Sequence, residues 1–142
     1  MLSLGDYMPT NRYYNLNIEK KNRLDNAILD EMTRHTYEHI NLSNVVREAD
    51  ISRGSLYQYF KNKSDLYHHY IDIISKEKKK YLNTIKHTHD SLDMIYQLLS
   101  NAIEFLIYHK RFSLIGVKLH ESKDSNIIQM IEEANLATIK YY

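Results

Sequence analysis

The feature that most constrains the fold of this chain is the scarcity of residues that interrupt helices. Its 142 residues include only three glycines and one proline. Because these two residue types are the strongest markers of turns, few positions favour the tight turns that join strands. After Asn17, residues with good helix propensity dominate, and apolar residues recur at helical spacing. The sequence therefore predicts an all-α protein.

Capping residues place the first four helices. The first is expected over about residues 17–35, and Asn41 opens a second, shorter helix. A turn at Asp50 separates it from a third helix that Ser52 caps. Asn62 caps a fourth helix. Two short helices joined by a tight turn, with a preceding helix as the third wall of their core, form the helix-turn-helix pattern.

The remaining residues predict a helical bundle. Ser91 can cap a helix over residues 92–109, whose apolar residues cover most of its circumference, as is typical of the central helix of a bundle. Further helices are expected over residues 112–120 and from near Asn126 to Tyr142. The last helix has no stop signal, so the bundle is interpreted as truncated. Aromatic side chains that could line a ligand cavity there are Tyr96, Phe105, Tyr108 and Phe112.

Three parts of the chain follow from these patterns. Residues 1–14 lack helical periodicity and are interpreted as an N-terminal arm, with Met8 as an alternative start. Residues 15–65 are expected to form the helix-turn-helix domain, and residues 66–142 the helical domain.

Composition argues against several classes of protein. The chain has no cysteine, which excludes disulfides and thiolate metal sites. No apolar run approaches the ~18 residues of a membrane helix, so we expect a soluble, cytoplasmic protein without a membrane partner. Neither a nucleophile elbow nor a glycine-rich phosphate loop occurs, so no enzyme is expected. Three histidine pairs lack a third ligand, and no metal site or cofactor is expected; the pairs are His35/His39, His68/His69 and His87/His89.

The stretch over residues 49–63 carries the functional signal. Leu56 and Phe60 lie four residues apart and form the apolar side of the third helix. No acidic residue occurs between Asp50 and Asp65. A short helix with an apolar back and an acid-free front rich in hydrogen-bond donors suits a phosphate backbone and a major groove. The side chains that can donate are Arg53, Ser55, Tyr57, Gln58 and Tyr59.

The run ISRGSLYQYFKNKSDL, over residues 51–66, resembles the DNA-binding signature of TetR-type transcriptional regulators. That signature reads Val/Ile-Ser-x-Gly-Ser/Thr-Leu/Phe-Tyr-x-Tyr/His-Phe-x-x-Lys-x-x-Leu, and the resemblance covers about residues 15–70. It implies a homodimer that binds a palindromic operator in double-stranded DNA. It also implies a repressor that an unidentified small molecule releases by binding to the helical domain.

The resemblance assigns roles to individual side chains. Arg53 and Gln58 match variable positions that reach bases, while Asn41 and Ser43 match the backbone contacts of the second helix. Ser52, at the start of the third helix, completes the predicted DNA-binding set. The residues that match phosphate contacts are Ser55, Tyr57, Tyr59 and Lys63.

Two positions depart from the family pattern, which has glycine at both. Thr36 ends the first helix, where a positive φ would cost roughly 1 kcal/mol or more. Asp50 tolerates a left-handed conformation better. The alternative function is a helical protein–protein interaction module that uses the same motif without binding DNA.

Overall fold

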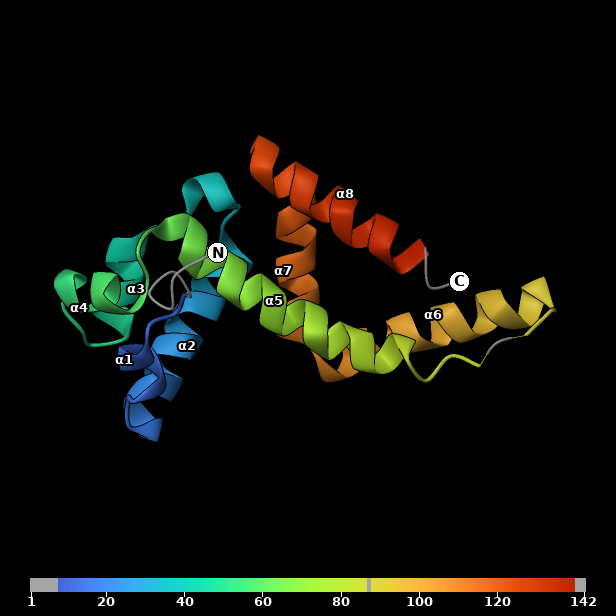
Figure 1. Ribbon diagram of the computed structural model, residues 1–142, viewed down its shortest axis with the longest axis horizontal. Coiled ribbons are helices and arrows are strands. Elements are labelled where there is room, and N and C mark those ends of the chain that lie inside the picture. Colours follow the sequence, from blue (N-terminus) through green and yellow to red (C-terminus); the bar gives the residue numbers. More distant parts are fainter. Residues whose placement is uncertain (1–7, 87, 140–142) are drawn as a thin grey trace, which may run out of the picture.

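The computed structural model describes residues 8–86 and 88–139, and within these ranges it contains helices and no strand (Figure 1). The predicted all-α class is therefore confirmed. The elements in chain order are α1 (Asn11–Tyr14), α2 (Ile18–Arg34), the 3₁₀-helix η1 (Tyr37–His39), α3 (Leu42–Glu48), α4 (Arg53–Tyr59), α5 (Lys63–Leu82), α6 (Ser91–Tyr108), α7 (Lys110–Glu121) and α8 (Ser125–Ile139).

Side-chain caps begin the helices of the N-terminal half. The predicted caps Asn41, Ser52 and Asn62 are confirmed, since each accepts a hydrogen bond from a backbone N–H in the first turn of its helix. The predicted cap Ser91 is wrong. Asp90 caps α6 instead, and its carboxylate accepts from the backbone N–H of Leu92 at 2.9 Å.

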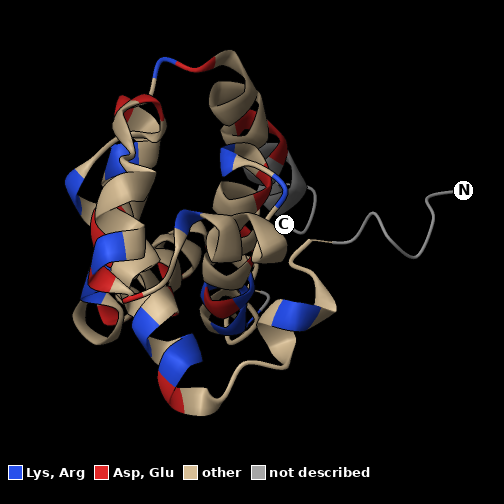
Figure 2. Ribbon diagram, turned by 90° about the vertical axis from the view of Figure 1, so that its left-hand side faces the viewer, with Lys and Arg blue, Asp and Glu red and all other residues tan. Residues whose placement is uncertain are grey.

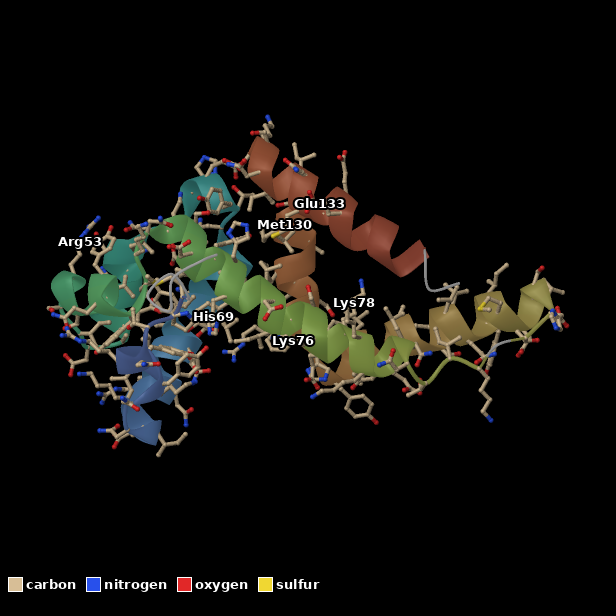
Figure 3. The ribbon with its side chains drawn as sticks, viewed as in Figure 1. Arg53, His69, Lys76, Lys78, Met130 and Glu133 are labelled. Carbon is tan, nitrogen blue, oxygen red and sulfur yellow. The ribbon has the colours of Figure 1, made fainter. Side chains whose placement is uncertain are left out.

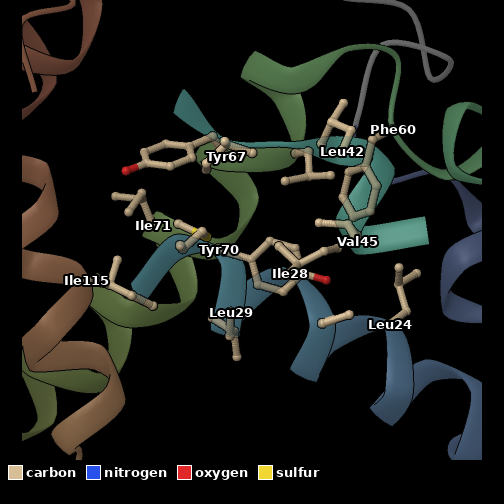
Figure 4. Close-up of a cluster of buried hydrophobic side chains, with 14 of the residues drawn as sticks. Leu24, Ile28, Leu29, Leu42, Val45, Phe60, Tyr67, Tyr70, Ile71 and Ile115 are labelled. Atoms are coloured by element: carbon tan, nitrogen blue, oxygen red, sulfur yellow. The ribbon is translucent and has the colours of Figure 1, made fainter. Parts of the chain in front are cut away.

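Helices α2 to α5 share one hydrophobic core (Figure 4). The predicted core residues Leu56 and Phe60 are each 1% exposed, which confirms the apolar side of the third helix. They belong to the same buried cluster as Leu24 and Ile28 of α2 and Val45 of α3, so α4 is packed against this core. Its opposite face is left open.

Part of the predicted N-terminal arm belongs to this core. Tyr13 of α1 is 1% exposed, and its hydroxyl donates to a carboxylate oxygen of Asp25 at 2.7 Å. The backbone N–H of Thr10 donates to the carbonyl of Tyr59 at 3.0 Å. Residues 10–14 therefore close the core beside α4 rather than extend as an arm, because a buried aromatic ring fixes them there. Residues 1–7 lie outside the described residues.

The two departures from the family's glycines have different outcomes. Asp50 adopts a left-handed conformation with φ of 53°, so the tight turn is kept without glycine. Thr36 has φ of −68° and ψ of 166°, which any residue adopts. The first helix therefore ends by an extended His35 and a turn of 3₁₀-helix, and no left-handed residue is needed there.

Helix α7 joins the C-terminal half to the helix-turn-helix region. Its Ile115 is fully buried in the shared core. At one end, Arg111 donates to Asn26 and Asp30 of α2, at 3.0 and 3.2 Å. At the other end, the carboxylate of Glu38 in η1 accepts from the turn between α7 and α8. Both ends of α7 are thus pinned to the same N-terminal elements.

The Glu38 contact is a cluster of hydrogen bonds on one oxygen. This oxygen accepts from the Ser122 hydroxyl and the Asp124 backbone N–H, both at 2.8 Å, and from the backbone N–H of Lys123. Burial alone would raise the pKa of Glu38, but the hydrogen bonds outweigh it and lower the pKa to about 2. The carboxylate is therefore charged at neutral pH.

The prediction that α6 is a central helix is wrong for this structure. Phe105 is its only buried residue, and the main contacts of α6 are with α5 and α7. Most of its other apolar residues are exposed, from one end of the helix to the other. The residues concerned are Leu92, Ile95, Tyr96, Leu99, Ile103, Leu106, Ile107 and Tyr108.

His69 of α5 lies among aromatic rings. Its ring is 5.4 Å from that of Tyr13 and 5.0 Å from that of Tyr70, and its Nε2 is buried without a hydrogen-bond partner among the described residues. Burial lowers its pKa below the ordinary 6.5, opposed by the carboxylates of Asp25 and Asp72 and assisted by nearby lysines. The neutral ring is therefore the form that the fold accommodates.

This placement predicts a loss of stability in mild acid. Because the pKa of His69 is lower in the folded chain, the unfolded chain takes up the proton first. The stabilisation is complete above about pH 6.5 and declines as the pH falls below it. Thermal unfolding followed by circular dichroism at pH 8 and pH 5.5 should show a smaller drop in Tm for His69→Leu than for the unmodified chain. An equal drop in both chains would contradict this assignment.

Candidate nucleic-acid interface

Helix α4 presents its open face at one end of the molecule. Arg53 extends from this end, far from α8, which carries Met130 and Glu133 (Figure 3). Leu56 and Tyr59 face the core, whereas Arg53, Tyr57 and Gln58 are exposed. Tyr57 leaves 42% of its surface open although it is a large aromatic residue. The helical period therefore separates a packing face from a polar face that is free to bind.

Arg53 links the open face of α4 to the start of α3. Its guanidinium donates to the hydroxyl of Ser43 at 3.2 Å and lies 5.9 Å from the centre of the Tyr57 ring. Both contacts are exposed, so an incoming group can compete for the arginine. Four predicted site residues thus lie on one exposed surface, namely Ser43, Arg53, Tyr57 and Gln58.

The predicted residues at the helix starts have a structural role in this chain. The side chain of Asn41 accepts from the backbone N–H of Ser43 at 2.9 Å. The Ser52 hydroxyl accepts from the backbone N–H of Ser55 at 3.0 Å and lies 2.8 Å from the Ser55 hydroxyl. Asn41 and Ser52 are therefore caps that orient the two helices, and their contact with DNA stays a prediction.

Two predicted phosphate contacts are placed differently from the rest. Tyr59 is only 6% exposed, so its ring is part of the core and not a free side chain on the open face. Lys63 donates to the carbonyl of Tyr37 at 2.8 Å, with its ammonium 4.4 Å from the centre of that ring. Lys63 thus ties the start of α5 to η1. Sequence spacing could not show this, because Tyr37 is distant in the chain.

Gly54 is a functional candidate to which the sequence analysis assigned no role. It lies in the first turn of α4 without a positive φ, and a Cβ built on it meets only the Ser52 hydroxyl oxygen, at 3.8 Å. Glycine inside a helix costs roughly 0.5–1 kcal/mol relative to alanine. The fold therefore gains nothing from glycine here. A close approach by another molecule is one reason to keep a side chain away, and the motif position itself was the available signal.

The charge around this surface is mixed. Figure 2 shows the molecule from the end that carries α3 and α4, with basic and acidic segments both in view. Arg47 is close in sequence to Glu48 and Asp50, and all three are exposed. Binding at this surface would therefore depend on hydrogen-bond donors more than on a field of a single sign.

The aromatic residues predicted to line a ligand cavity do not converge. Phe105 is buried against Tyr81 and stacks on His109, which also stacks on Phe112. Tyr96 and Tyr108 are 70% and 74% exposed. A shallow hollow of about 260 Å³ lies instead between α5 and α8, and it is lined by Ser64, His68, Asn126, Gln129, Met130 and Glu133.

Two of the paired histidines have hydrogen-bond partners of their own. Nδ1 of His39 is 2.9 Å from the Thr36 hydroxyl, and Nδ1 of His68 is 2.8 Å from the carbonyl of Ser64. His87 lies outside the described residues. In the part of the chain that the structure describes, no group of three or more histidine or acidic residues could hold a metal ion.

Comparison with known proteins identifies this arrangement. Residues 26–70 match the family described as bacterial regulatory proteins, tetR family. The chain is thus similar to the TetR family in its N-terminal half. A crystal structure of a TetR family transcriptional regulator from Chloroflexus aurantiacus J-10-FL superimposes with a TM-score of 0.76 and 29% identity, over 88% of this chain and 60% of the other. The helix-turn-helix domain followed by further helices is thus the arrangement of the TetR family.

Curated relatives match with lower identity. An HTH-type transcriptional regulator of Staphylococcus aureus (strain bovine RF122 / ET3-1) is 24% identical over 93 residues, which is 66% of this chain and 49% of that protein. A second, from Staphylococcus aureus (strain USA300), is 23% identical over 92 residues, or 65% of this chain and 48% of that protein. The chain spans about half the length of these relatives. Within its described residues, no helix is long and apolar enough to cross a membrane.

Proposed function

We propose that this chain is a sequence-specific DNA-binding transcriptional regulator that inserts α4 into the major groove. The observation that carries the proposal is Gly54, a helical glycine that the fold does not need. It is flanked by the exposed donors of α4, where the absence of a side chain would let a phosphate backbone or base edge approach closely.

The geometry supports a division of work on this surface. Arg53 and Gln58 are free to read base edges, and Arg53 can leave the Ser43 hydroxyl to do so. Ser55 and Tyr57 would contact phosphates, with Ser43 and Asn41 at the start of α3 on the adjacent backbone. Ser52 supports them as a cap.

For Tyr59 and Lys63 we propose an indirect contribution. Tyr59 supports α4 from the core, and Lys63 fixes the start of α5 against η1. Both would set the position of α4 in the groove rather than bind phosphate through free side chains.

The family likeness supports the wider proposal of a cytoplasmic, non-enzymatic homodimer on a palindromic operator. Two α4 helices related by a two-fold axis would read its two halves. We further propose that the chain represses transcription and that a small-molecule effector releases it from the operator. The hydrogen bonds at the two ends of α7, made by Arg111 and to Glu38, support this effector response, because they connect the helical domain directly to α2 and η1.

A salt series on DNA selected from a random library tests the proposal. We expect affinity, measured by fluorescence anisotropy, to fall as salt is raised, because the cationic Arg53 displaces counterions from the DNA when it binds. Arg53→Ala should relax base preference at one position of each half-site and cost about 1–3 kcal/mol of binding free energy. Lys110→Ala, which removes an exposed cation at the start of α7, is the matched control and should bind normally.

The alternative, a protein–protein interaction module, makes the opposite prediction. Under that alternative no salt-dependent DNA binding appears even at low ionic strength, and Arg53→Ala behaves like Lys110→Ala. That result would remove the DNA-binding proposal.

A further inference from the structure

The segment that begins α1 closes the C-terminal end of α4. The hydroxyl of Thr10 donates to the carbonyl of Gln58 at 2.7 Å, and its backbone N–H donates to the carbonyl of Tyr59 at 3.0 Å. The last carbonyls of a helix have no partner within the helix itself, so they need donors from elsewhere. Two of the last carbonyls of α4 receive these donors from a single residue that precedes the first long helix.

Helix α1 is fixed in this place by its buried ring. The Tyr13 hydroxyl donates to Asp25 at 2.7 Å, and the Tyr13 ring lies 5.4 Å from that of Phe60. The same carboxylate accepts from the Tyr70 hydroxyl and from the Lys21 ammonium, both at 2.7 Å. The anchor of α1 is therefore itself held from α2 and α5. Helices α1 and α4 are parts of one packed unit.

Arg12 lies on the outside of α1. Its neighbour Tyr13 is buried, whereas Arg12 is exposed, and its side chain makes no ion pair or hydrogen bond with another residue that the structure describes. No acidic residue occurs between Asp6 and Glu19. The guanidinium is therefore an unpaired positive charge within the described chain, and it is open to an anion from outside.

The end of α4 that α1 closes is the end nearer to the DNA backbone. In helix-turn-helix docking the N-terminal residues of the recognition helix contact base edges, so its C-terminal end lies toward the phosphates that border the groove. Helices α1 and α4 are in contact at the same end of the molecule (Figure 1). Open carbonyls there would repel phosphates, but Thr10 satisfies two of them and Arg12 adds a positive charge.

We propose that Arg12 binds a backbone phosphate beside the major groove that α4 enters, so that α1 extends the DNA-binding surface beyond the helix-turn-helix. This inference rests on the proposed function and adds a contact to it. The guanidinium fork matches the oxygens of a phosphate, and Thr10 and Tyr13 hold it in position. Because a phosphate carries no sequence information, the contact raises affinity for every sequence and helps to fix the register of the chain on the duplex.

Replacement of Arg12 tests the contact. Arg12→Ala should lower affinity about tenfold at low salt, equally on selected and unrelated DNA, and should reduce the slope of log affinity against log salt by roughly one per chain. Arg12→Lys keeps the charge and should restore most of that slope. Arg23→Ala is the matched control and should bind normally, because Arg23 is exposed on the side of α2 that carries Asn26, a partner of α7.

DNA with single neutral methylphosphonate linkages locates the phosphate. At the contacted position, the neutral linkage should weaken binding by the unmodified chain but should not weaken binding by Arg12→Ala any further. The Tm of Arg12→Ala should equal that of the unmodified chain, since an exposed side chain without internal partners contributes little to stability. A loss of affinity without a change in Tm would therefore come from the interface and not from the fold.

The proposal is overturned if Arg12→Ala matches Arg23→Ala in affinity and salt slope, or if no neutral linkage distinguishes Arg12→Ala from the unmodified chain. The DNA-binding function is judged separately by Arg53→Ala. If Arg53→Ala relaxes base preference while Arg12→Ala changes nothing, only the contact of α1 is removed. If the unmodified chain shows no salt-dependent DNA binding at all, the proposed function and this contact fall together.

Discussion

Replacement of Gly54 by alanine is expected to weaken DNA binding at least about tenfold, equivalent to roughly 1.4 kcal/mol, while it leaves the fold intact or slightly more stable. The new methyl group meets only the Ser52 hydroxyl, at 3.8 Å, so nothing inside the protein opposes it. Alanine also favours the helix by up to about 1 kcal/mol. Fluorescence anisotropy on selected DNA measures the loss, and urea unfolding measures the stability.

Gly116 offers a matched control within the same chain. It also lies inside a helix, and a Cβ built on it has no atom within 4 Å. Gly116→Ala should therefore produce a similar rise in stability with no change in affinity, because α7 is not part of the proposed DNA surface. If both variants bound DNA equally well, the close approach proposed for α4 would be wrong. Affinity that fell together with stability in Gly54→Ala would show that the effect comes from the fold.

Replacement of Phe60 by alanine is expected to destabilise the chain by about 3–5 kcal/mol, as is typical of large aromatic residues removed from a core. Phe60 is 1% exposed, and its ring lies 5.4 Å from that of Tyr13 and 6.1 Å from that of Tyr70. The resulting cavity would weaken both the packing of α4 against the core and the packing of α1 beside Phe60. Urea unfolding followed by circular dichroism measures the change, and DNA binding should fall because the folded fraction falls.

Tyr57→Ala is the matched control on the same helix. Tyr57 is 42% exposed, so its removal should cost less than about 1 kcal/mol of stability. It should nevertheless reduce DNA affinity, since its hydroxyl is a proposed phosphate contact. Stability and binding are thus expected to separate between the two variants. Comparable destabilisation by both would mean that the two faces of α4 are not distinct.

Much of the DNA-binding half could be predicted from the sequence because its signals are local. The caps Asn41, Ser52 and Asn62 act within one helical turn, and the spacing of Leu56 and Phe60 sets which side of α4 is buried. These effects depend only on neighbours in the chain. They were sufficient to predict the order of these helices and which face of α4 is open.

The placements that the sequence did not predict occur where a residue's environment depends on distant segments. Tyr13 is buried because Asp25 and the Phe60 ring receive it, and Lys63 turns inward because the carbonyl of Tyr37 lies within reach. Neither partner can be identified from periodicity. For α6, composition alone suggested a central helix, but burial requires neighbours on every side, and its main contacts in the described chain are with α5 and α7.

Local sequence is enough to specify the helices, most of their caps and the polar face of α4, since hydrogen bonds and side-chain periods within one helix decide them. Which side chains remain free to bind depends instead on how the helices pack against one another. This packing placed Tyr59 in the core, tied Lys63 to η1, and left open space above Gly54. It also left the face of α6 uncovered. Burial is a property of packed elements, so no single stretch of sequence could specify it.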